Sequence, residues 1–413
     1  MKKLIAFLLS IGPGIFCIGY TVGTGSVTSM TKSGSQFGSQ LLWVLALSCF
    51  FSWLLMEAYG RYAVITGRTA INSFKTEFKF GKLVAVLVIF GIVIGQWNSL
   101  SGIVGLSANA IYEVVRLFIP QLESENYWAV LGIAIFILIV MYSLLIIGKY
   151  SFFEKALILF VTIMGVSFIV SMFIVLPPGG DIIKGFAPNI PVGGNLMVAA
   201  FVGTTMAAPT FVVRPLLMKG KGWGRENVKD QARDSLFSAF LMFTISASIM
   251  ITAMGTMYYK GLTINRVIDM VNTLEPVAGK FAVGLFMTGA LSAGISSVFP
   301  ILMVAPLLIA DYRKGELDMG SNLFKSLSAV ACVVGLSVPI LGANPIAAQI
   351  ATQVANVFVL PLVIGGIFYL VNQKKVMGHH KPGILFNIGL IMAFGFSCII
   401  SYIGFQALRG LIL

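Results

Sequence analysis

The feature that most constrains this chain is a succession of apolar runs, each long enough to cross a bilayer. Hydrophobic residues make up 58% of the 413 positions and charged residues only 10%, whereas soluble domains carry about 25% charged residues. A membrane-spanning helix needs about 17 to 25 residues. Runs of this length predict eleven helices, at 4–31, 39–60, 83–116, 127–148, 153–176, 194–218, 233–258, 279–310, 325–342, 345–371 and 384–408. The sequence therefore predicts an all-α polytopic membrane protein without a sizeable soluble domain.

Basic residues in the short connections predict how these helices are oriented. The net charge is +13, but Lys and Arg lie between apolar runs, so they are topology signals and no nucleic-acid partner is expected. If the N-terminus is cytoplasmic, most of the 28 Lys and Arg residues fall on the cytoplasmic side, and the outer side keeps only Lys32, Arg116, Lys184, Lys260, Arg266, Lys280 and Arg409. The positive-inside rule then predicts a multi-pass protein of the plasma (inner) membrane with an external C-terminus.

Two segments at the edges of these runs have a predicted role of their own. Met1-Lys2-Lys3 resembles the start of a signal peptide, but no small-residue cleavage site follows, so the first run is expected to be a retained helix. The basic stretch from Lys219 to Arg233, together with Asp234, is expected to form a short amphipathic helix on the cytoplasmic surface.

Small and polar residues interrupt two of the apolar runs at membrane depth. The first run breaks at Tyr20-Thr21-Val22-Gly23-Thr24-Gly25-Ser26, and the sixth breaks at Gly203-Thr204-Thr205-Met206-Ala207-Ala208-Pro209-Thr210. Lipid cannot satisfy the backbone groups that a break exposes, so each break must face protein, water or a solute. Ordinary Gly or Pro kinks are the simpler interpretation. However, breaks at corresponding positions of two halves are typical of the central site of secondary transporters.

The position of the two breaks also predicts the topology. Helices 1–5, at about 4–176, and helices 6–10, at about 194–371, form two five-helix halves, and an odd number of helices gives the second half inverted topology. Helix 11, at about 384–408, is an addition to this repeat. We therefore expect residues 1–413 to form a single transmembrane transporter domain.

Short motifs spread along the chain resemble those of the NRAMP family of divalent-metal transporters. They are Gly12-Pro13-Gly14, Gly34-Ser35-Gln36-Phe37-Gly38, Leu41-Leu42-Trp43, Ile65-Thr66-Gly67-Arg68, Ala293-Gly294-Ile295-Ser296-Ser297, Thr352-Gln353-Val354 and Leu360-Pro361. The resemblance implies a LeuT-like inverted-repeat fold that works by alternating access. It also implies proton-coupled import of manganese or iron.

The sequence departs from the family at the residues that bind the metal. The family's Asp-Pro-Gly-Asn aligns with Gly23-Thr24-Gly25-Ser26, and its Met-Pro-His aligns with Ala208-Pro209-Thr210. The acidic stretch on the family's proton route aligns with Gly95-Gln96-Trp97-Asn98, which carries no acid. Gln353 alone matches a residue that lines the family's site. The chain therefore resembles a divergent member that lacks the metal-site Asp, Met and His.

Around the two breaks the sequence offers hydroxyls, an amide and exposed backbone as a candidate substrate site. Its residues are Thr21, Gly23, Thr24, Gly25, Ser26, Ala207, Ala208, Thr210 and Gln353. Candidate gating or route residues are Gln96, Asn98 and Arg214, although we interpret Arg214 first as an interfacial residue that snorkels towards the cytoplasm. No carboxylate is expected in this site, and no cysteine has metal-ligand spacing. A hydrated ion suits such a site better than a bare divalent cation.

Two kinds of cargo stay open for a secondary-active transporter with this site. One is a divalent cation (Mn, Fe or Mg) that keeps some of its water, without NRAMP-type proton coupling, because titratable groups are missing. The other is a small carboxylate-bearing solute, such as an amino acid, held by free N–H groups of the broken helix. A sensor or scaffold has no supporting feature. No enzyme activity and no cofactor are expected, since a nucleophile–base pair and a nucleotide loop are missing. The sequence says nothing about oligomeric state.

Overall fold

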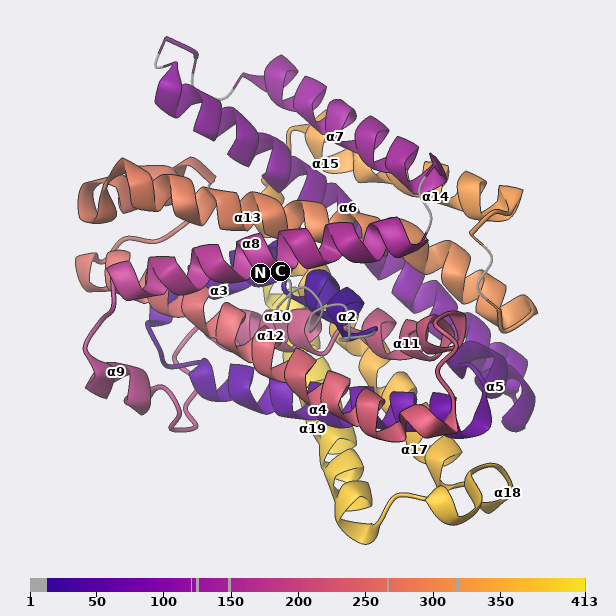
Figure 1. Cartoon of the computed structure of the whole chain (residues 1–413). Helices are drawn as coiled ribbons and strands as arrows, with labels where there is room; N and C mark the ends of the chain where they lie inside the picture. Colours follow the sequence, from indigo (N-terminus) through magenta and orange to yellow (C-terminus); the bar gives the residue numbers. More distant parts are fainter. Residues whose placement is uncertain are drawn as a thin grey trace.

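A computed structural model describes residues 13–119, 121–123, 126–147, 150–265, 267–316 and 319–412. All regular secondary structure in these ranges is helical (Figure 1). Residues 1–12 lie outside the described residues, and with them the predicted start of the first helix, Lys2, Lys3 and the Gly12 of the first motif. Arg266 also lies outside them.

The helices follow one another as the apolar runs predict. The first half contains α2 (Gly14–Thr21), α3 (Thr24–Phe37), α4 (Leu42–Thr66), α5 (Ala70–Glu77), α6 (Gly81–Phe118), α7 (Tyr127–Ile147) and α8 (Tyr150–Ile174). After α9 (Gly179–Lys184), the second half contains α10 (Asn195–Thr205), α11 (Ala208–Gly220), η1 (Arg225–Asn227), α12 (Val228–Thr256), η2 (Tyr258–Lys260), α13 (Val267–Arg313), α14 (Asn322–Gly335), α15 (Ser337–Leu341), α16 (Pro345–Asn356), η3 (Val357–Val359) and α17 (Leu360–Asn372). The chain closes with α18 (Lys374–Met377), η4 (Gly378–His380) and α19 (Ile384–Ile412).

Ten helices in the described part of the chain are long and apolar enough to cross a membrane. The first predicted helix is not among them; its described part consists of α2 and α3, which have 8 and 14 residues. With this broken helix added, the spans correspond to the eleven predicted runs. The protein is therefore a multi-pass, all-α membrane protein.

The two broken helices lie at the centre of the bundle. In Figure 1, α2 and α10 lie in the middle, and α7 lies at the edge of the bundle. Burial agrees with this view, because 94% of the most apolar window in Asn195–Gly220 is buried inside the protein, against 22% of that in Ile384–Gly410. The most deeply buried of the ten spans is thus one that is broken, as its freed backbone groups require.

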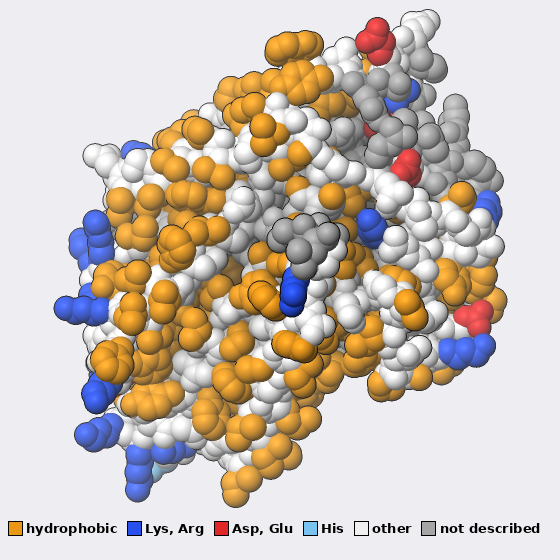
Figure 2. Space-filling view, turned by 180° about the vertical axis from the view of Figure 1, so that it is seen from behind, with side chains coloured by type: hydrophobic (Ala, Val, Ile, Leu, Met, Phe, Trp, Pro, Cys, Tyr) orange, Lys and Arg blue, Asp and Glu red, His pale blue; other side chains and the backbone are white. Residues whose placement is uncertain are grey.

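Charge is distributed unevenly between the two ends of the helices. Figure 2 shows a broad hydrophobic surface, with Lys and Arg gathered along the edge that corresponds to the α5 and α18 side of Figure 1. We call this side, which also holds the end of α11, the basic end. We call the side that holds α9 and η2 the opposite end.

Candidate functional site

Both interruptions of the apolar runs are helix breaks in the structure. The first helix stops at Thr21 and resumes at Thr24, with Val22 and an extended Gly23 (φ −82°, ψ −164°) between the halves. The second stops at Thr205 and resumes at Ala208. Two short non-helical segments therefore face each other in the middle of the bundle.

Hydroxyl groups tie the two breaks together. The Thr21 carbonyl, freed at the end of α2, accepts hydrogen bonds from Ser26 Oγ at 2.7 Å and from Thr204 Oγ1 at 3.0 Å. The two hydroxyl oxygens lie 3.0 Å apart. Since Ser26 belongs to α3 and Thr204 to α10, one exposed carbonyl links both broken helices.

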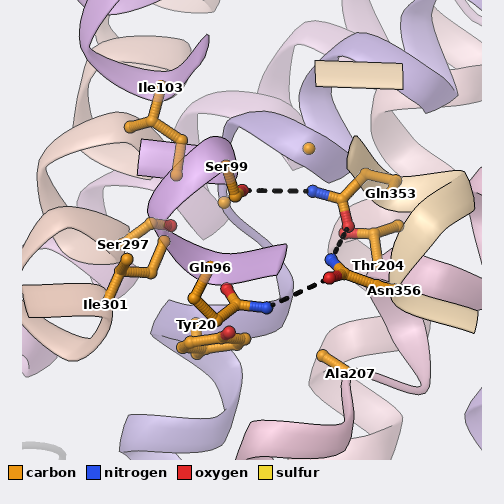
Figure 3. Close-up of a pocket in the computed structure, with 12 residues that line it drawn as sticks. Tyr20, Gln96, Ser99, Ile103, Thr204, Ala207, Ser297, Ile301, Gln353 and Asn356 are labelled. Carbon is orange, nitrogen blue, oxygen red and sulfur yellow. Dashed lines mark hydrogen bonds between the residues drawn. The ribbon is translucent and has the colours of Figure 1, made fainter. Parts of the chain in front are cut away.

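A series of hydrogen-bonded side-chain amides lines the cavity beside the breaks, and we call it the amide wall (Figure 3). Gln353 Nε2 on α16 lies 3.5 Å from Ser99 Oγ on α6. Asn356 Nδ2 donates to Gln353 Oε1 at 3.2 Å, and Gln96 Nε2 donates to Asn356 Oδ1 at 3.3 Å. These hydrogen bonds link two residues of α6, Ser99 and Gln96, through two residues of α16, Gln353 and Asn356, and all four side chains are neutral.

Gln349 connects the amide wall to the first broken helix. Its Nε2 donates to the Ser99 carbonyl at 2.9 Å and to Thr24 Oγ1 at 3.3 Å. Its Oε1 accepts from Gln353 Nε2 at 3.2 Å. Gln349 is fully buried, so its hydrogen bonds fix the distance between α3, α6 and α16.

The breaks and the amide wall enclose a small cavity of about 10 Å³, which is about the room that one water molecule needs. No acid is found among the described residues that line it. They are Tyr20, Gly23, Gly25, Gln96, Ser99, Ile103, Thr204, Ala207, Ser297, Ile301, Gln353 and Asn356. The described part of the chain also contains no group of three or more His, Cys, Asp or Glu side chains that could hold a metal. Neutral oxygen atoms are therefore the ligands that this site offers.

Glycine allows Gln353 to approach both broken helices. A Cβ atom at Gly25 would lie 2.3 Å from Gln353 Nε2, and one at Gly203 would lie 1.8 Å from the Gln353 backbone oxygen. Such distances are too short for any side chain, and a backbone atom cannot move away as a side chain can. Both glycines thus position Gln353 at the cavity.

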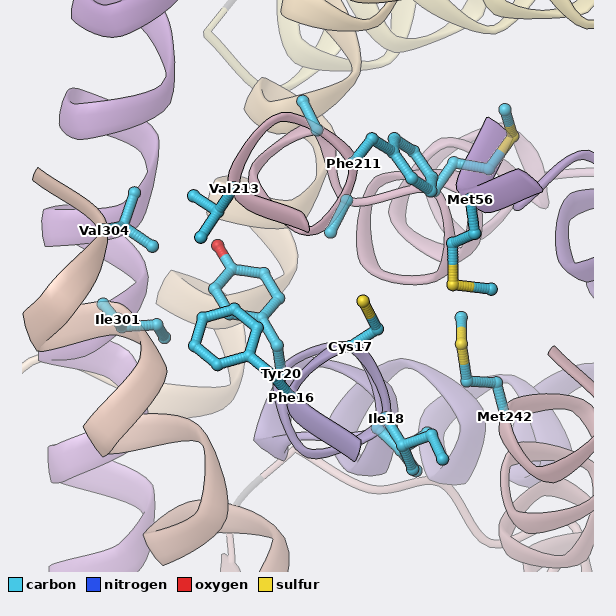
Figure 4. Packing of buried hydrophobic residues seen from close by; sticks show 14 of the residues in the cluster. Phe16, Cys17, Ile18, Tyr20, Met56, Phe211, Val213, Met242, Ile301 and Val304 are labelled. Carbon is cyan, nitrogen blue, oxygen red and sulfur yellow. The ribbon is translucent and has the colours of Figure 1, made fainter. Parts of the chain in front are cut away.

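Apolar side chains close the cavity towards the basic end. The rings of Phe16 and Tyr20 stack with centroids 6.3 Å apart, and Figure 4 shows Ile301, Val304 and Val213 around them. The Tyr20 hydroxyl points towards Val213 in that view, is buried, and has no hydrogen-bond partner among the described residues. The two rings therefore lie between the cavity and the basic end.

An ion pair lies beyond these rings, and it corrects two predictions. Arg214 and Asp234 are 2.6 Å apart, with side chains 0% and 2% exposed. Asp234 also accepts from the Gly14 backbone N–H at 3.0 Å. The interpretation of Arg214 as a snorkelling residue is wrong, and so is the assignment of Asp234 to a surface helix. Asp234 lies in the second turn of the membrane helix α12, and each charge has a partner that replaces water.

The other buried acids near the basic end also hold helices. Glu57 on α4 pairs with Arg61 at 2.7 Å and accepts from Gln231 Nε2 at 2.6 Å. Asp311, at the end of α13, accepts from the backbone N–H groups of Ile71 and Asn72 in the first turn of α5. A carboxylate at a helix N-terminus is favourable. These acids therefore serve packing between helices, at a distance from the cavity.

Several predicted site residues act through their position next to the cavity rather than by lining it. Thr21 directs its hydroxyl back to the Cys17 carbonyl, at 2.7 Å, and offers its own carbonyl instead. Thr210 Oγ1 donates to the Ala207 carbonyl at 2.7 Å. Ala208 is the buried first residue of α11.

Gln96 and Asn98 point to different places. Gln96 belongs to the amide wall of the cavity. Asn98 is exposed, donates to the Ile94 carbonyl at 2.9 Å, and lines a separate groove of about 570 Å³ between α6 and the outer face of α16. The structure therefore does not bring Asn98 to the cavity.

Sequence reasoning missed Ser99, Gln349 and Asn356, and it included Ser297 only as part of a family motif. Gln349, Gln353 and Asn356 are spaced by four and three residues, which places them on one face of a helix. This spacing is a signal that could have revealed the amide wall. Ser297 donates to the Gly19 carbonyl at 2.9 Å and also lines the cavity.

Curated proteins related to this chain support the motifs found along it. The chain is 23% identical over 391 residues to the divalent metal cation transporter MntH of Vibrio campbellii, a match that covers 91% of this chain and 86% of the relative. It is 24% identical over 429 residues to the MntH of Listeria monocytogenes, with 99% and 92% covered. It is also similar to the natural resistance-associated macrophage protein 2 homolog of Dictyostelium discoideum, at 21% identity, with 98% and 65% covered.

Solved structures with the same fold include transporters of different families. A point mutant of the manganese transporter of Eremococcus coleocola superposes with a TM-score of 0.74 at 13% identity, over 96% of this chain and 85% of the other. MhsT in complex with L-phenylalanine gives a TM-score of 0.67 at 16% identity, over 96% and 98%. Likeness at this identity establishes the fold, which is the LeuT-like fold with two inverted repeats and an added eleventh helix.

A family model settles which of these groups the chain is part of. The model described as natural resistance-associated macrophage protein-like matches residues 14–406, which is nearly the whole chain. The chain belongs to the Nramp family, and it is a member whose central cavity has no acidic side chain among its described lining residues.

Proposed function

We propose that this protein is a secondary-active carrier of a divalent cation (Mn, Fe or Mg) that keeps part of its water shell in the site. The observation that carries the proposal is the cavity lining, which consists of neutral hydroxyls, amides and apolar groups. The cargo class comes from the family, whose curated members include divalent metal cation transporters. Neutral oxygens replace water poorly around a doubly charged ion, so the ion retains water, as Mg²⁺ does readily. In this proposal Ser26, Thr204 and Gln353 hold that water, together with the Thr21 carbonyl.

We further propose that the carrier works without NRAMP-type proton coupling. A proton relay in a membrane needs titratable groups. The buried acids Glu57, Asp234 and Asp311 already have partners at the basic end, and none of them is among the described residues that line the cavity.

The proposal includes an orientation and a domain organisation. The basic end faces the cytoplasm, which is supported by the gathering of Lys and Arg there (Figure 2). The N-terminus is then cytoplasmic and the C-terminus external, in the plasma (inner) membrane. The repeats span about 4–176 and about 194–371 in one domain, and the Arg214–Asp234 pair acts as part of the inner gate.

Uptake of radioactive Mn²⁺ into proteoliposomes tests the cargo. The proposal predicts saturable uptake that Mg²⁺ inhibits competitively, because a site that binds a hydrated ion discriminates little between the two. Protein-free liposomes provide the background. Absence of any saturable uptake of Mn²⁺, Fe²⁺ or Mg²⁺ would contradict the proposal.

A small carboxylate-bearing solute, such as an amino acid, is the second candidate. It is favoured by the N-terminus of α3 at Thr24, which lies between the cavity-lining Gly23 and Gly25 and carries the positive end of a helix dipole. Thermal stabilisation by a panel of amino and organic acids discriminates between the candidates. Stabilisation by one carboxylate compound without metal flux would favour the second.

A further inference from the structure

One face of α3 leads from the central cavity to the opposite end of the molecule. Gly25, Ser29, Lys32 and Gln36 are spaced by four, three and four residues, so they lie on the same side of the helix. Gly25 lines the central cavity. Gln36 lines a second cavity of about 540 Å³, together with Ser35, Phe37, Gly193, Tyr258, Gly261 and Thr263. This face therefore connects two cavities.

The side chains of the two residues between these cavities are polar and lack partners in the described part of the chain. The Ser29 side chain is fully buried, and its hydroxyl makes no hydrogen bond to a described residue. A buried hydroxyl without a partner is unfavourable unless water or a solute satisfies it. Lys32 is half-buried, and no hydrogen bond or ion pair joins its ammonium group to any other described residue. Its charge is thus uncompensated on this face.

We infer that this face lines the outer half of the substrate route and that Lys32 is a specificity-determining residue which weakens cation binding. The inference deepens the proposed function and rests on it. Lys32 lies seven residues from Gly25, which is about 10 Å along the helix. That distance is close to the Debye length at physiological salt, about 8 Å, and buried charges are screened less than exposed ones.

The physical consequence is a carrier with low affinity for its cation. A divalent ion in the cavity feels twice the repulsion of a monovalent ion, and no carboxylate among the described lining residues offsets it. Such a site suits an ion that is abundant, as Mg²⁺ is, better than a trace metal. The repelling charge is the ammonium group of Lys32, which lies on α3 between Gly25 at the central cavity and Gln36 at the second cavity.

Substitution of Lys32 tests the inference in proteoliposomes loaded for Mn²⁺ uptake. Lys32→Gln is expected to lower the KM for Mn²⁺ about tenfold with little change in kcat, and Lys32→Arg is expected to behave like the natural protein. Lys260→Gln is the matched control, because Lys260 is exposed at the same end and its loss changes the net charge equally. Equal KM values for Lys32→Gln and Lys260→Gln would overturn the inference and leave the proposed function intact.

A second readout tests the route itself, whatever the cargo. In a variant whose exposed Cys398 is replaced by Ser, Lys32→Cys is expected to react with a membrane-impermeant thiol reagent. Met30→Cys, which replaces a fully buried residue on another face of α3, is expected not to react. If Lys32→Cys is unreactive, the route assignment is wrong. If Lys32→Cys reacts but neither it nor the natural protein carries a divalent cation, the proposed function fails and the route assignment stands.

Discussion

The centre of the molecule and its basic end differ in the kind of polar groups that they bury: neutral groups at the centre and charged groups at the basic end. The described lining of the central cavity consists of hydroxyls, amides, carbonyls and apolar groups, without a charge. The basic end buries full charges, of which the Arg214–Asp234 pair is completely enclosed. Both regions lie on the same broken helices, since Arg214 is on α11 and Asp234 binds the first residue of α2.

This difference shows where the protein can bury a charged side chain. A buried ion is tolerated when its partner is fixed, because removing it from water costs several kcal/mol. The described residues that line the central cavity provide no such fixed partner for a charge. The fold therefore keeps its charges where helices are held and leaves the cavity neutral.

The largest expected effect comes from breaking the ion pair of the basic end. Arg214→Met leaves Asp234 charged and buried without its partner, so we expect a loss of about 3–5 kcal/mol in unfolding free energy. Arg68→Met is the control, because the side chains of Arg68 and Glu77 in their ion pair are 51% and 25% exposed, and it should cost less than about 1 kcal/mol. Denaturant unfolding of the protein in detergent micelles measures both.

A double variant sharpens this result. Arg214→Met combined with Asp234→Asn removes both charges, and we expect it to be more stable than Arg214→Met alone. If Arg214→Met and Arg68→Met destabilise equally, the buried pair does not hold the basic end together, and the contrast between the two regions fails.

The second-largest effect is expected from Gly203→Ala, because Gln353 approaches α10 closely at Gly203. Gly203→Ala would place its Cβ 1.8 Å from the Gln353 carbonyl oxygen, so the backbone of α16 has to move. Overpacking of this kind costs about 1–3 kcal/mol, and we expect uptake to fall at least tenfold. Gly132→Ala on α7 has no described atom within 4 Å of the new Cβ and should leave uptake unchanged. Equal uptake by both variants would show that Gln353 need not be positioned by Gly203.

A carboxylate placed in the cavity tests its neutrality. Gln353→Glu keeps the shape of the side chain and adds a charged oxygen, which a divalent cation prefers. We expect the affinity for Mn²⁺ to rise at least tenfold and to become dependent on pH. Asn98→Asp is the matched control, since Asn98 lies on the outer face of α6, and its affinity should stay as in the natural protein. Tighter binding by both variants would mean that the cavity is not the binding site.

Gly23→Asp is another way to place a carboxylate in the cavity, but the structure leaves no space for the new side chain. Gly23 aligns with the family's metal-binding Asp, but a Cβ atom there would lie 1.9 Å from Ser297 Oγ. Gly23→Asp would therefore disturb α13 before it could bind a metal. Gln353 is the better position for a new carboxylate.

The smallest effect is expected at the opposite end, in α9. The Lys184 ammonium donates to Asp181 and lowers the pKa of its carboxyl group, and the Tyr259 hydroxyl adds to this. Because the folded pKa lies below the ordinary value of 3.8, any stabilisation is present above that pH and is lost as the pH falls through the folded pKa. Asp181→Asn should leave uptake at neutral pH unchanged. Reduced uptake would show that α9 takes part in transport.

The sequence predicted the features that depend on local residue type, above all the two helix breaks. Glycines and hydroxyl residues in two apolar runs indicated broken helices rather than ordinary kinks, and the breaks lie at Val22–Gly23 and Met206–Ala207. The motif that contains Gln353 also pointed to a residue that lines the described cavity. The absence of an acid from the described cavity lining followed directly from the composition of the runs.

Features that depend on side-chain partners could not be predicted in this way. Arg214 looks like an interfacial cation until Asp234, twenty residues later, is seen beside it. Asn98 and Gln96 look equivalent in the sequence, and only the rotation of α6 separates the groove from the cavity. Such pairings between helices depend on how far each helix is turned, and a single sequence fixes that angle poorly.

The most direct test of the central claim is simultaneous measurement of Mn²⁺ uptake and internal pH in proteoliposomes. A neutral cavity predicts saturable uptake without acidification of the lumen, at a rate that an imposed proton gradient does not change. Acidification that follows Mn²⁺ entry and is abolished together with it would contradict the account, because it would require a titratable group on the route.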